Sequence, residues 1–181
     1  MSKTKPQYKV TKKGTLSIEE IEKVITSNVS KVTAFVFLNY KKLPLDSSTF
    51  FLLHKKICSD LFEEAGVPRK WEVTVWDLVV AKFYEIRVQL KELDDSITFR
   101  LPILKTEQDK KQFLAEIMYQ FIKIHPFFDY NWRVVRLIGL LFLLKNDMNV
   151  TTFRWVNRTD FVHAMKIITS DNDYSLLINL L

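Results

Sequence analysis

A twelve-residue stretch at positions 125–136, HPFFDYNWRVVR, constrains the fold of this chain more than any other feature. It separates an amphipathic pattern that ends near Ile124 from the most apolar run in the chain, residues 137–144. Pro126 should end the incoming helix, because proline lacks an N–H group and its ring clashes with the preceding turn. We therefore expect two core helices that meet at a polar loop.

The polar side chains of this loop favour an anion-binding site. Asp129 or Asn131 can cap the helix that follows. The first turn of that helix carries Arg133 and Arg136, which are three residues apart and lie on roughly one face. Two cations at a helix N-terminus oppose the helix dipole, whereas a bound anion would reverse this penalty. Because guanidinium groups bind phosphate in a bidentate manner, the pattern predicts a phosphate ligand.

The same stretch resembles the signature loop of the Fic family, H-x-F-x-(D/E)-G-N-(G/K)-R-x-x-R. Two positions depart from it, because Tyr130 replaces a small residue, usually glycine, and Trp132 replaces glycine or lysine. The resemblance covers roughly residues 45–181 and implies an all-α (mainly) fold, a Fic-like helical bundle with a short β-hairpin flap. The matching positions are His125, Phe127, Asp129, Asn131, Arg133 and Arg136.

The resemblance also implies a reaction, the transfer of AMP from ATP to a Ser, Thr or Tyr hydroxyl of a target protein. His125 would be the general base that removes the hydroxyl proton, a role that suits imidazole because its pKa is near neutral. Asp129 would hold Mg²⁺, a hard cation that takes oxygen ligands and bridges phosphates. Mg²⁺ is thus the implied cofactor and ATP the implied donor.

The remaining matched residues would bind the phosphates of the nucleotide. Asn131 and the backbone amide at Trp132 would hold the α-phosphate oxygens. Arg133 and Arg136 would hold or support the terminal phosphates. Taken without the family, the same side chains have a plainer interpretation as helix caps, a hydrogen-bonded loop histidine and surface charges.

The two departures leave two hypotheses open. A small residue at position 130 lets the backbone approach phosphate, whereas the Tyr130 ring must point away or fill the pocket. Trp132 keeps its backbone amide but alters the pocket rim. The protein is then either a divergent nucleotidyltransferase acting on a protein, or a catalytically inactive Fic-fold interaction protein whose nucleotide pocket is blocked by both rings. In either case the flap near residues 71–80 would dock a target protein by strand addition.

Many Fic proteins also carry an inhibitory helix, (S/T)-x-x-x-E-(G/N), whose glutamate pairs with the second motif arginine. The first helix offers two partial matches. Residues 15–19 have the right spacing but continue with Glu20, and residues 27–31 end in Lys31. The pattern therefore predicts no inhibitory glutamate within this chain.

Composition excludes several other classes of protein. With 181 residues and 48% hydrophobic composition, the chain can bury the core of a single domain. The net charge of +6 is dispersed and densest at residues 3–13, which makes nucleic-acid binding an unfavoured main function. Three glycines are too few for a Gly-rich phosphate loop. Residues 137–144 are too short a run to cross a membrane.

The cysteine count and the first residues suggest where the protein acts. Cys58 is a lone cysteine, which fits a reducing compartment. The first residues are polar and show no signal peptide. We therefore expect a cytoplasmic protein, or an effector delivered without a recognisable signal.

Helical spacing organises the rest of the chain. We expect a flexible basic N-terminus over residues 1–15 and a single domain over 16–181. Helices are predicted at 17–40, 46–66, 77–93, 106–124, 131–146, 159–170 and 174–181, with a strand at 71–76 and a connection at 94–105. The predicted N-terminal caps are Ser17, Asp46, Thr106 and Thr159. His54 lies on an apolar helix face, where a hydrogen-bonded core histidine is the expected role.

Overall fold

The computed structural model describes residues 8–75, 78–150 and 158–181. Within them the chain is mainly α-helical, as predicted, with one short antiparallel hairpin. No helix in these ranges is long and apolar enough to cross a membrane. In chain order the elements are β1 (Tyr8–Thr11), β2 (Gly14–Ser17), α1 (Ile18–Asn39), α2 (Ser47–Cys58), α3 (Ile86–Arg100), the 3-10 turn η1 (Leu101–Ile103), α4 (Glu107–Ile124), α5 (Asn131–Lys145), α6 (Arg158–Asp171) and α7 (Ser175–Asn179).

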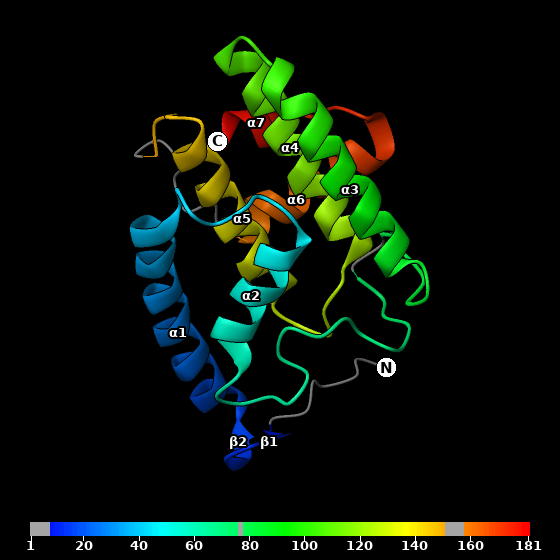
Figure 1. The fold of residues 1–181 in the computed structure, drawn as a ribbon. Coiled ribbons are helices and arrows are strands. Elements are labelled where there is room, and N and C mark those ends of the chain that lie inside the picture. The colour runs from blue at the N-terminus through cyan, green and yellow to red at the C-terminus, as the bar shows by residue number, and fades with distance from the viewer. Residues whose placement is uncertain (1–7, 76–77, 151–157) are drawn as a thin grey trace.

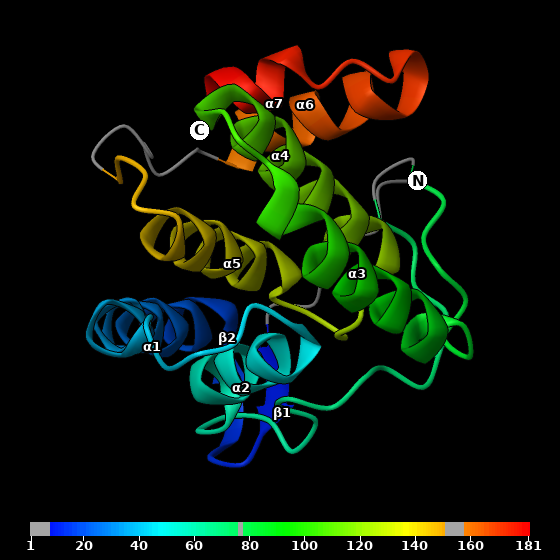
Figure 2. The same cartoon turned by 45° about the horizontal axis from the view of Figure 1, so that its top comes forward.

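Helix α5 forms the centre of the bundle. Figure 2 shows it between the α1–α2 pair and α4, with α3 beyond α4. Because its sequence is apolar on every side, it buries residues around its whole circumference. This confirms the prediction that the helix after the polar loop is a core helix. Its N-terminus, and therefore the loop at 125–130, is held by helices packed on several sides.

Three of the predicted helix starts are confirmed. Ser17 and Thr106 each form a capping box with the acidic residue three positions later, and Asp46 accepts a hydrogen bond from the Thr49 amide. Thr159 does not mark a helix start, because α6 is already helical at Arg158.

Two helix boundaries differ from the predictions. Helix α2 ends at Cys58 instead of near Gly66, and turns follow it. Helix α3 spans Ile86–Arg100 instead of 77–93, because its buried stripe continues through Leu93 to Ile97 before Pro102 enters η1. In the expected connection at 94–105, residues 94–100 are therefore helical.

The β-hairpin forms where we expected an irregular segment. Strands β1 and β2 pair antiparallel from Tyr8–Ser17 to Thr11–Gly14, and Gly14 adopts a φ of 90° in the turn. The turn is fixed to the body because the Lys12 amide donates to the Leu61 carbonyl at 2.8 Å. Figure 1 shows the hairpin at the start of α1.

The segment at 71–80, which we call the flap segment, has less regular structure than predicted. It forms one antiparallel bridge, between Val75 and Leu78, and residues 76–77 at its tip lie outside the described residues. The predicted strand at 71–76 is thus reduced to a single bridging residue in the part that the structure describes.

Candidate functional site

His125 ends helix α4 in a left-handed conformation, with a φ of 47°. Pro126 follows it, so the predicted break of the helix is confirmed. The carbonyls of Ile124 and His125 at this helix end accept hydrogen bonds from the guanidinium of Arg69, at 3.4 and 2.8 Å. The α4 end therefore has a buried cation beside it, which suits the negative end of the helix dipole.

Arg69 also ties the flap segment to this helix end. Its guanidinium donates to the carbonyls of Trp71 and Ala81, and its side chain is almost fully buried. In addition, the Ala81 amide donates to the Lys123 carbonyl at 2.9 Å. No role for Arg69 was predicted from the sequence. Its partners are backbone carbonyls, and no sequence pattern shows where these lie.

Neither of the two predicted caps caps helix α5. The N-cap is Tyr130, in a left-handed conformation with a φ of 58° and no side-chain cap hydrogen bond. The Asp129 carboxylate folds forward instead, so that Oδ1 accepts from the Tyr130 amide at 2.8 Å. Asn131 reaches back to Phe127, whose amide donates to Oδ1 at 3.0 Å and whose carbonyl accepts from Nδ2 at 2.8 Å. The Asn131 side chain therefore holds the two ends of the 127–131 turn together.

His54 is a hydrogen-bonded core histidine that contacts the loop, which is the structural role that we predicted. Its Nδ1 accepts from the Gly66 amide at 2.8 Å, which leaves the proton on Nε2 to be donated to the Asp129 carbonyl at 3.2 Å. Its ring stacks on Phe127 with the centroids 3.9 Å apart. Burial lowers the pKa of His54 to about 4, so the ring is neutral at pH 7.

The loop presents several backbone amides. The N–H groups of Phe128, Asp129, Asn131 and Trp132 make no hydrogen bond to any described residue. The last two belong to the first turn of α5, where N–H groups lack intrahelical partners and the helix dipole favours an anion. Phosphate binding at these amides stays a prediction from the sequence.

These groups surround a cavity of about 740 Å³. This volume is within the usual range for small-molecule sites. Arg158 on α6 is a wall residue that the sequence gave no reason to include. The lining residues are Glu22 from α1, Val73, Thr74 and Val75 from the flap segment, Ile122 and His125 from α4, Phe128 to Arg133 from the loop and α5, and Arg158.

The His125 imidazole is neutral at pH 7. Burial lowers its pKa to about 4, the nearby Ile122 carbonyl and the Asp129 carboxylate partly offset this effect, and the Arg69 guanidinium adds to it. Its Nδ1 is buried without a hydrogen bond of ordinary geometry to any described residue. An unprotonated imidazole in a cavity wall can accept a proton from a bound hydroxyl group.

Two ion pairs join residues of the cavity wall to the N-terminal part of the chain. Lys9 Nζ on β1 lies 2.8 Å from Asp129 Oδ2. Glu22 Oε2 on α1 lies 2.6 Å from Arg133 Nη2. All four side chains are partly exposed, so both pairs are in contact with solvent. The two charged residues of the motif that face the cavity are therefore neutralised by hairpin and helix α1.

The rings of Tyr130 and Trp132, the two departures from the family motif, pack against other aromatic side chains. The Tyr130 ring is largely buried, with its centroid 6.1 Å from that of Phe62. Trp132 packs against Phe161 of α6 at 4.4 Å. The guanidinium of Arg136 lies over the Trp132 ring at 5.3 Å, and burial together with Arg133 lowers the pKa of Arg136 to about 10. Arg136 is not among the residues that line the cavity, unlike Arg133.

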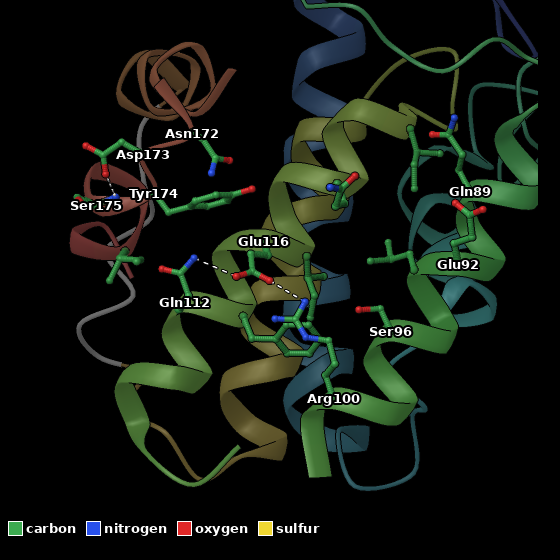
Figure 3. A pocket seen from close by; sticks show the side chains of 16 residues that line it. Gln89, Glu92, Ser96, Arg100, Gln112, Glu116, Asn172, Asp173, Tyr174 and Ser175 are labelled. Carbon is green, nitrogen blue, oxygen red and sulfur yellow. Dashed lines mark hydrogen bonds and ion pairs between the residues drawn. The ribbon is translucent and has the colours of Figure 1, made fainter. Parts of the chain in front are cut away.

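A second cavity, of about 850 Å³, lies between α3, α4 and the α6–α7 turn. Figure 3 shows Glu116 at its centre, where the carboxylate accepts from Arg100 at 2.8 Å and from Gln112 at 3.0 Å. The Asp173 carboxylate accepts from the Ser175 amide. These polar groups satisfy one another, and no residue of the 125–136 loop lines this cavity. The loop cavity is therefore the candidate functional site.

The fold and the loop together define a Fic-type domain. The model of the Fic/DOC family matches residues 44–143, which is more than half of the chain, so the protein belongs to that family. Among curated proteins, none matches the sequence significantly.

Solved structures with a similar fold include Fic domains of Bartonella effectors. BepC from Bartonella tribocorum, a VirB-translocated effector with bound AMPPNP, has a TM-score of 0.75 and 16% identity, covering 94% of this chain and 88% of that one. A putative cell filamentation protein from Bartonella quintana with bound ADP has a TM-score of 0.79 and 16% identity, covering 94% and 86%. A third Fic domain, from an effector of Bartonella sp. AR 15-3, has a TM-score of 0.77 and 19% identity, covering 94% of this chain and 84% of that one.

Proposed function

We propose that this protein is a nucleotidyltransferase that transfers AMP from ATP to a Ser, Thr or Tyr hydroxyl of a target protein. The observation that carries the proposal is the convergence of a neutral His125, unbonded amides at the start of α5 and the Arg133 guanidinium on one cavity. Membership of the Fic/DOC family supports it. So do the related folds whose structures contain AMPPNP and ADP.

Each group has a distinct part in the proposed step. The α-phosphate oxygens bind the amides of residues 131 and 132, and the terminal phosphates bind Arg133 after Glu22 has left it. His125 takes the proton of the target hydroxyl while that oxygen attacks the α-phosphorus. The bond from phosphorus to the bridging oxygen breaks, and pyrophosphate leaves. Positioning and charge stabilisation supply most of the rate, as is usual for transfer at phosphorus.

Mg²⁺ at Asp129 is the cation that the family resemblance implies, but the side chains as arranged do not fit it. Oδ2 is paired with the Lys9 ammonium, and Oδ1 accepts from the Tyr130 amide. Within the described residues, no group of three or more His, Cys, Asp or Glu side chains could hold a metal. Mg²⁺ could use this carboxylate only after Lys9 had withdrawn from it.

Arg136 has an indirect part in this proposal. Its guanidinium lies over the Trp132 ring and outside the cavity lining, so it supports the start of α5 and adds positive charge near Arg133.

The target protein is proposed to dock on the flap segment. The side chains of Trp71 and Val79 are 48% and 86% exposed, which leaves apolar surface at both ends of the segment. The amides of Val73 and Thr74 make no hydrogen bond to any described residue. An extended peptide could pair with these groups and so place a hydroxyl in front of His125. A reducing cytoplasm is the proposed compartment, in keeping with the unpaired thiol of Cys58.

The experiment is transfer of radiolabelled AMP from ATP to proteins of a cell extract, and to the enzyme itself. Wild-type protein should label at least one band, and His125→Ala should abolish labelling while folding normally. If wild-type protein binds no nucleotide by calorimetry and labels nothing, the proposal fails. The inactive interaction protein would then be the better hypothesis.

A further inference from the structure

Lys9 brings an ammonium group to the carboxylate of Asp129, from a strand 120 residues earlier in the chain. The Nζ–Oδ2 distance is 2.8 Å, and the side chains are 37% and 42% exposed. Asp129 lies in the cavity wall beside the unbonded amides of residues 131 and 132. Lys9 is not itself among the residues that line the cavity, but its ammonium contacts a carboxylate that does. From there it can meet a phosphate group bound at those amides.

The backbone holds Lys9 there independently of the ion pair. The Lys12 amide donates to the Leu61 carbonyl at 2.8 Å, which fixes β1 against the turn after α2. Strand β2 runs directly into α1 through the Ser17 capping box. Lys9 pairs in register with Leu16, next to that junction. The position of Lys9 is thus fixed relative to α1, the helix that carries Glu22.

We propose that Lys9 is a phosphate-binding residue of this site and serves there in place of a divalent cation. The inference rests on the proposed function, because it assumes that a nucleoside triphosphate binds the loop. An ammonium group has three donors. One donor meets Asp129, so two remain for phosphate oxygens. Lysine binds phosphate as a point charge, and here the carboxylate orients it as it would orient a metal ion.

The test is calorimetric binding of an ATP analogue with a methylene group between the α- and β-phosphates, which cannot be cleaved at that bond. Binding is measured in excess EDTA and in excess MgCl₂, for wild type and for Lys9→Met, which keeps the length of the side chain without its charge. Lys12→Met is the matched control, because Lys12 is on the same hairpin and pairs with Glu63 at 3.6 Å, away from the loop. Lys9→Arg tests whether a different cation suffices.

Wild-type protein and Lys12→Met should bind the analogue in EDTA, with affinities within about threefold of those in MgCl₂. Lys9→Met should lose about tenfold or more in EDTA, as expected for a charge-assisted contact. It should regain part of that loss in MgCl₂, since Asp129 is then open to the metal. Lys9→Arg should retain binding in EDTA. Thermal unfolding of each variant confirms that the hairpin and the body remain folded.

Three results would overturn the inference. Binding by wild type in MgCl₂ but not in EDTA would mean that a divalent cation is required, and the proposed function would stand without this role for Lys9. Tighter binding by Lys9→Met than by wild type in both buffers would make Lys9 a competitor of the ligand. Absence of binding by wild type in either buffer would overturn both this inference and the proposed function.

Discussion

Glu22 of α1 and Arg133 of α5 form an ion pair at 2.6 Å, although 111 residues separate them in the chain. The pair occupies the guanidinium that is proposed to hold the terminal phosphates. The sequence predicted no inhibitory glutamate, because its two partial matches to the family pattern place that residue at Glu19 or at position 31, and the residue four positions before Glu22 is Ile18. Glu22 pairs with the first motif arginine, whereas the family pattern describes a pair with the second, so this ion pair is a different contact.

Glu22→Gln should therefore raise nucleotide affinity, by about three- to tenfold. The substitution frees Arg133 and removes a negative charge from the phosphate site, and a partly exposed pair is worth only about 1 kcal/mol. Calorimetry with ATP measures the change. Glu19→Gln is the matched control, because Glu19 pairs with Lys23 on the exposed side of the same helix. An equal gain in both variants would assign the effect to net charge and not to the pair.

Arg133→Ala should lower nucleotide affinity by about tenfold or more, because it deletes a charge-assisted contact worth about 1.5–3 kcal/mol. Without nucleotide, its free energy of unfolding should stay within about 1 kcal/mol of wild type, since the pair with Glu22 is partly exposed and the helix N-terminus loses an unfavourable cation. Arg87→Ala, an exposed position on α3, is the control. Unchanged affinity in Arg133→Ala would remove Arg133 from the site.

Acid should destabilise the protein between pH 6.5 and 4. The pKa of His54 and that of His125 are each lowered to about 4 by burial, against about 6.5 in an unfolded chain. The unfolded chain therefore binds more protons in this window, and stability that is present above pH 6.5 is lost as the pH falls. The loss is about 3 kcal/mol for each histidine.

Urea unfolding at several pH values between 7 and 4 measures this slope. His125→Ala should roughly halve it, because one of the two neutral buried rings is removed. His163→Gln, an exposed position on α6, should leave it as in wild type. A flat profile in wild type would contradict the burial of both rings.

Arg69→Met should cost about 3–5 kcal/mol of stability. The substitution keeps a long apolar side chain but leaves the carbonyls of Trp71, Ala81 and His125 without their charged donor. Thermal and denaturant unfolding measure the loss, with Arg87→Met as the exposed control. Hydrogen exchange at the Ala81 amide should also accelerate, because the flap segment is released from α4. A change below about 1 kcal/mol would show that other contacts hold the segment.

Local signals allowed much of the fold to be predicted. The caps at Ser17, Asp46 and Thr106 and the break at Pro126 depend on neighbouring residues, and all four appear in the structure. The continuous apolar run after Arg136 predicted a core helix for the same reason. These features need no knowledge of the rest of the chain.

The features that were missed depend on contacts between distant segments. The hairpin at 8–17 has little intrinsic strand signal and is fixed by the Lys12–Leu61 hydrogen bond. Asn131 looked like a cap, yet its side chain bonds to Phe127 because Tyr130 enters the helix in a left-handed conformation. The partners of Lys9 and Arg133 are 120 and 111 residues away, beyond the range of any local pattern.

Replacing both aromatic departures tests whether they block the pocket. The Tyr130 and Trp132 rings pack toward Phe62 and Phe161, so the variant with glycine at both positions should gain no more than about threefold in nucleotide affinity. It should be less stable than wild type by about 2–5 kcal/mol. Relief of the left-handed conformation at residue 130 returns only about 1 kcal/mol, whereas the contacts of one buried and one half-buried ring are lost.

Phe62→Ala is the matched control for that variant, because it removes the ring that Tyr130 contacts without changing the loop. Calorimetry with ATP gives the affinities, urea unfolding gives the stabilities, and labelled AMP transfer, with His125→Ala as the blank, gives the activities. A gain of tenfold or more in affinity or transfer for the glycine variant alone would mean that the rings occlude the site in wild type. In that case the inactive interaction protein would describe the natural state better than the enzyme, with the phosphate-binding groups intact beneath two closing side chains.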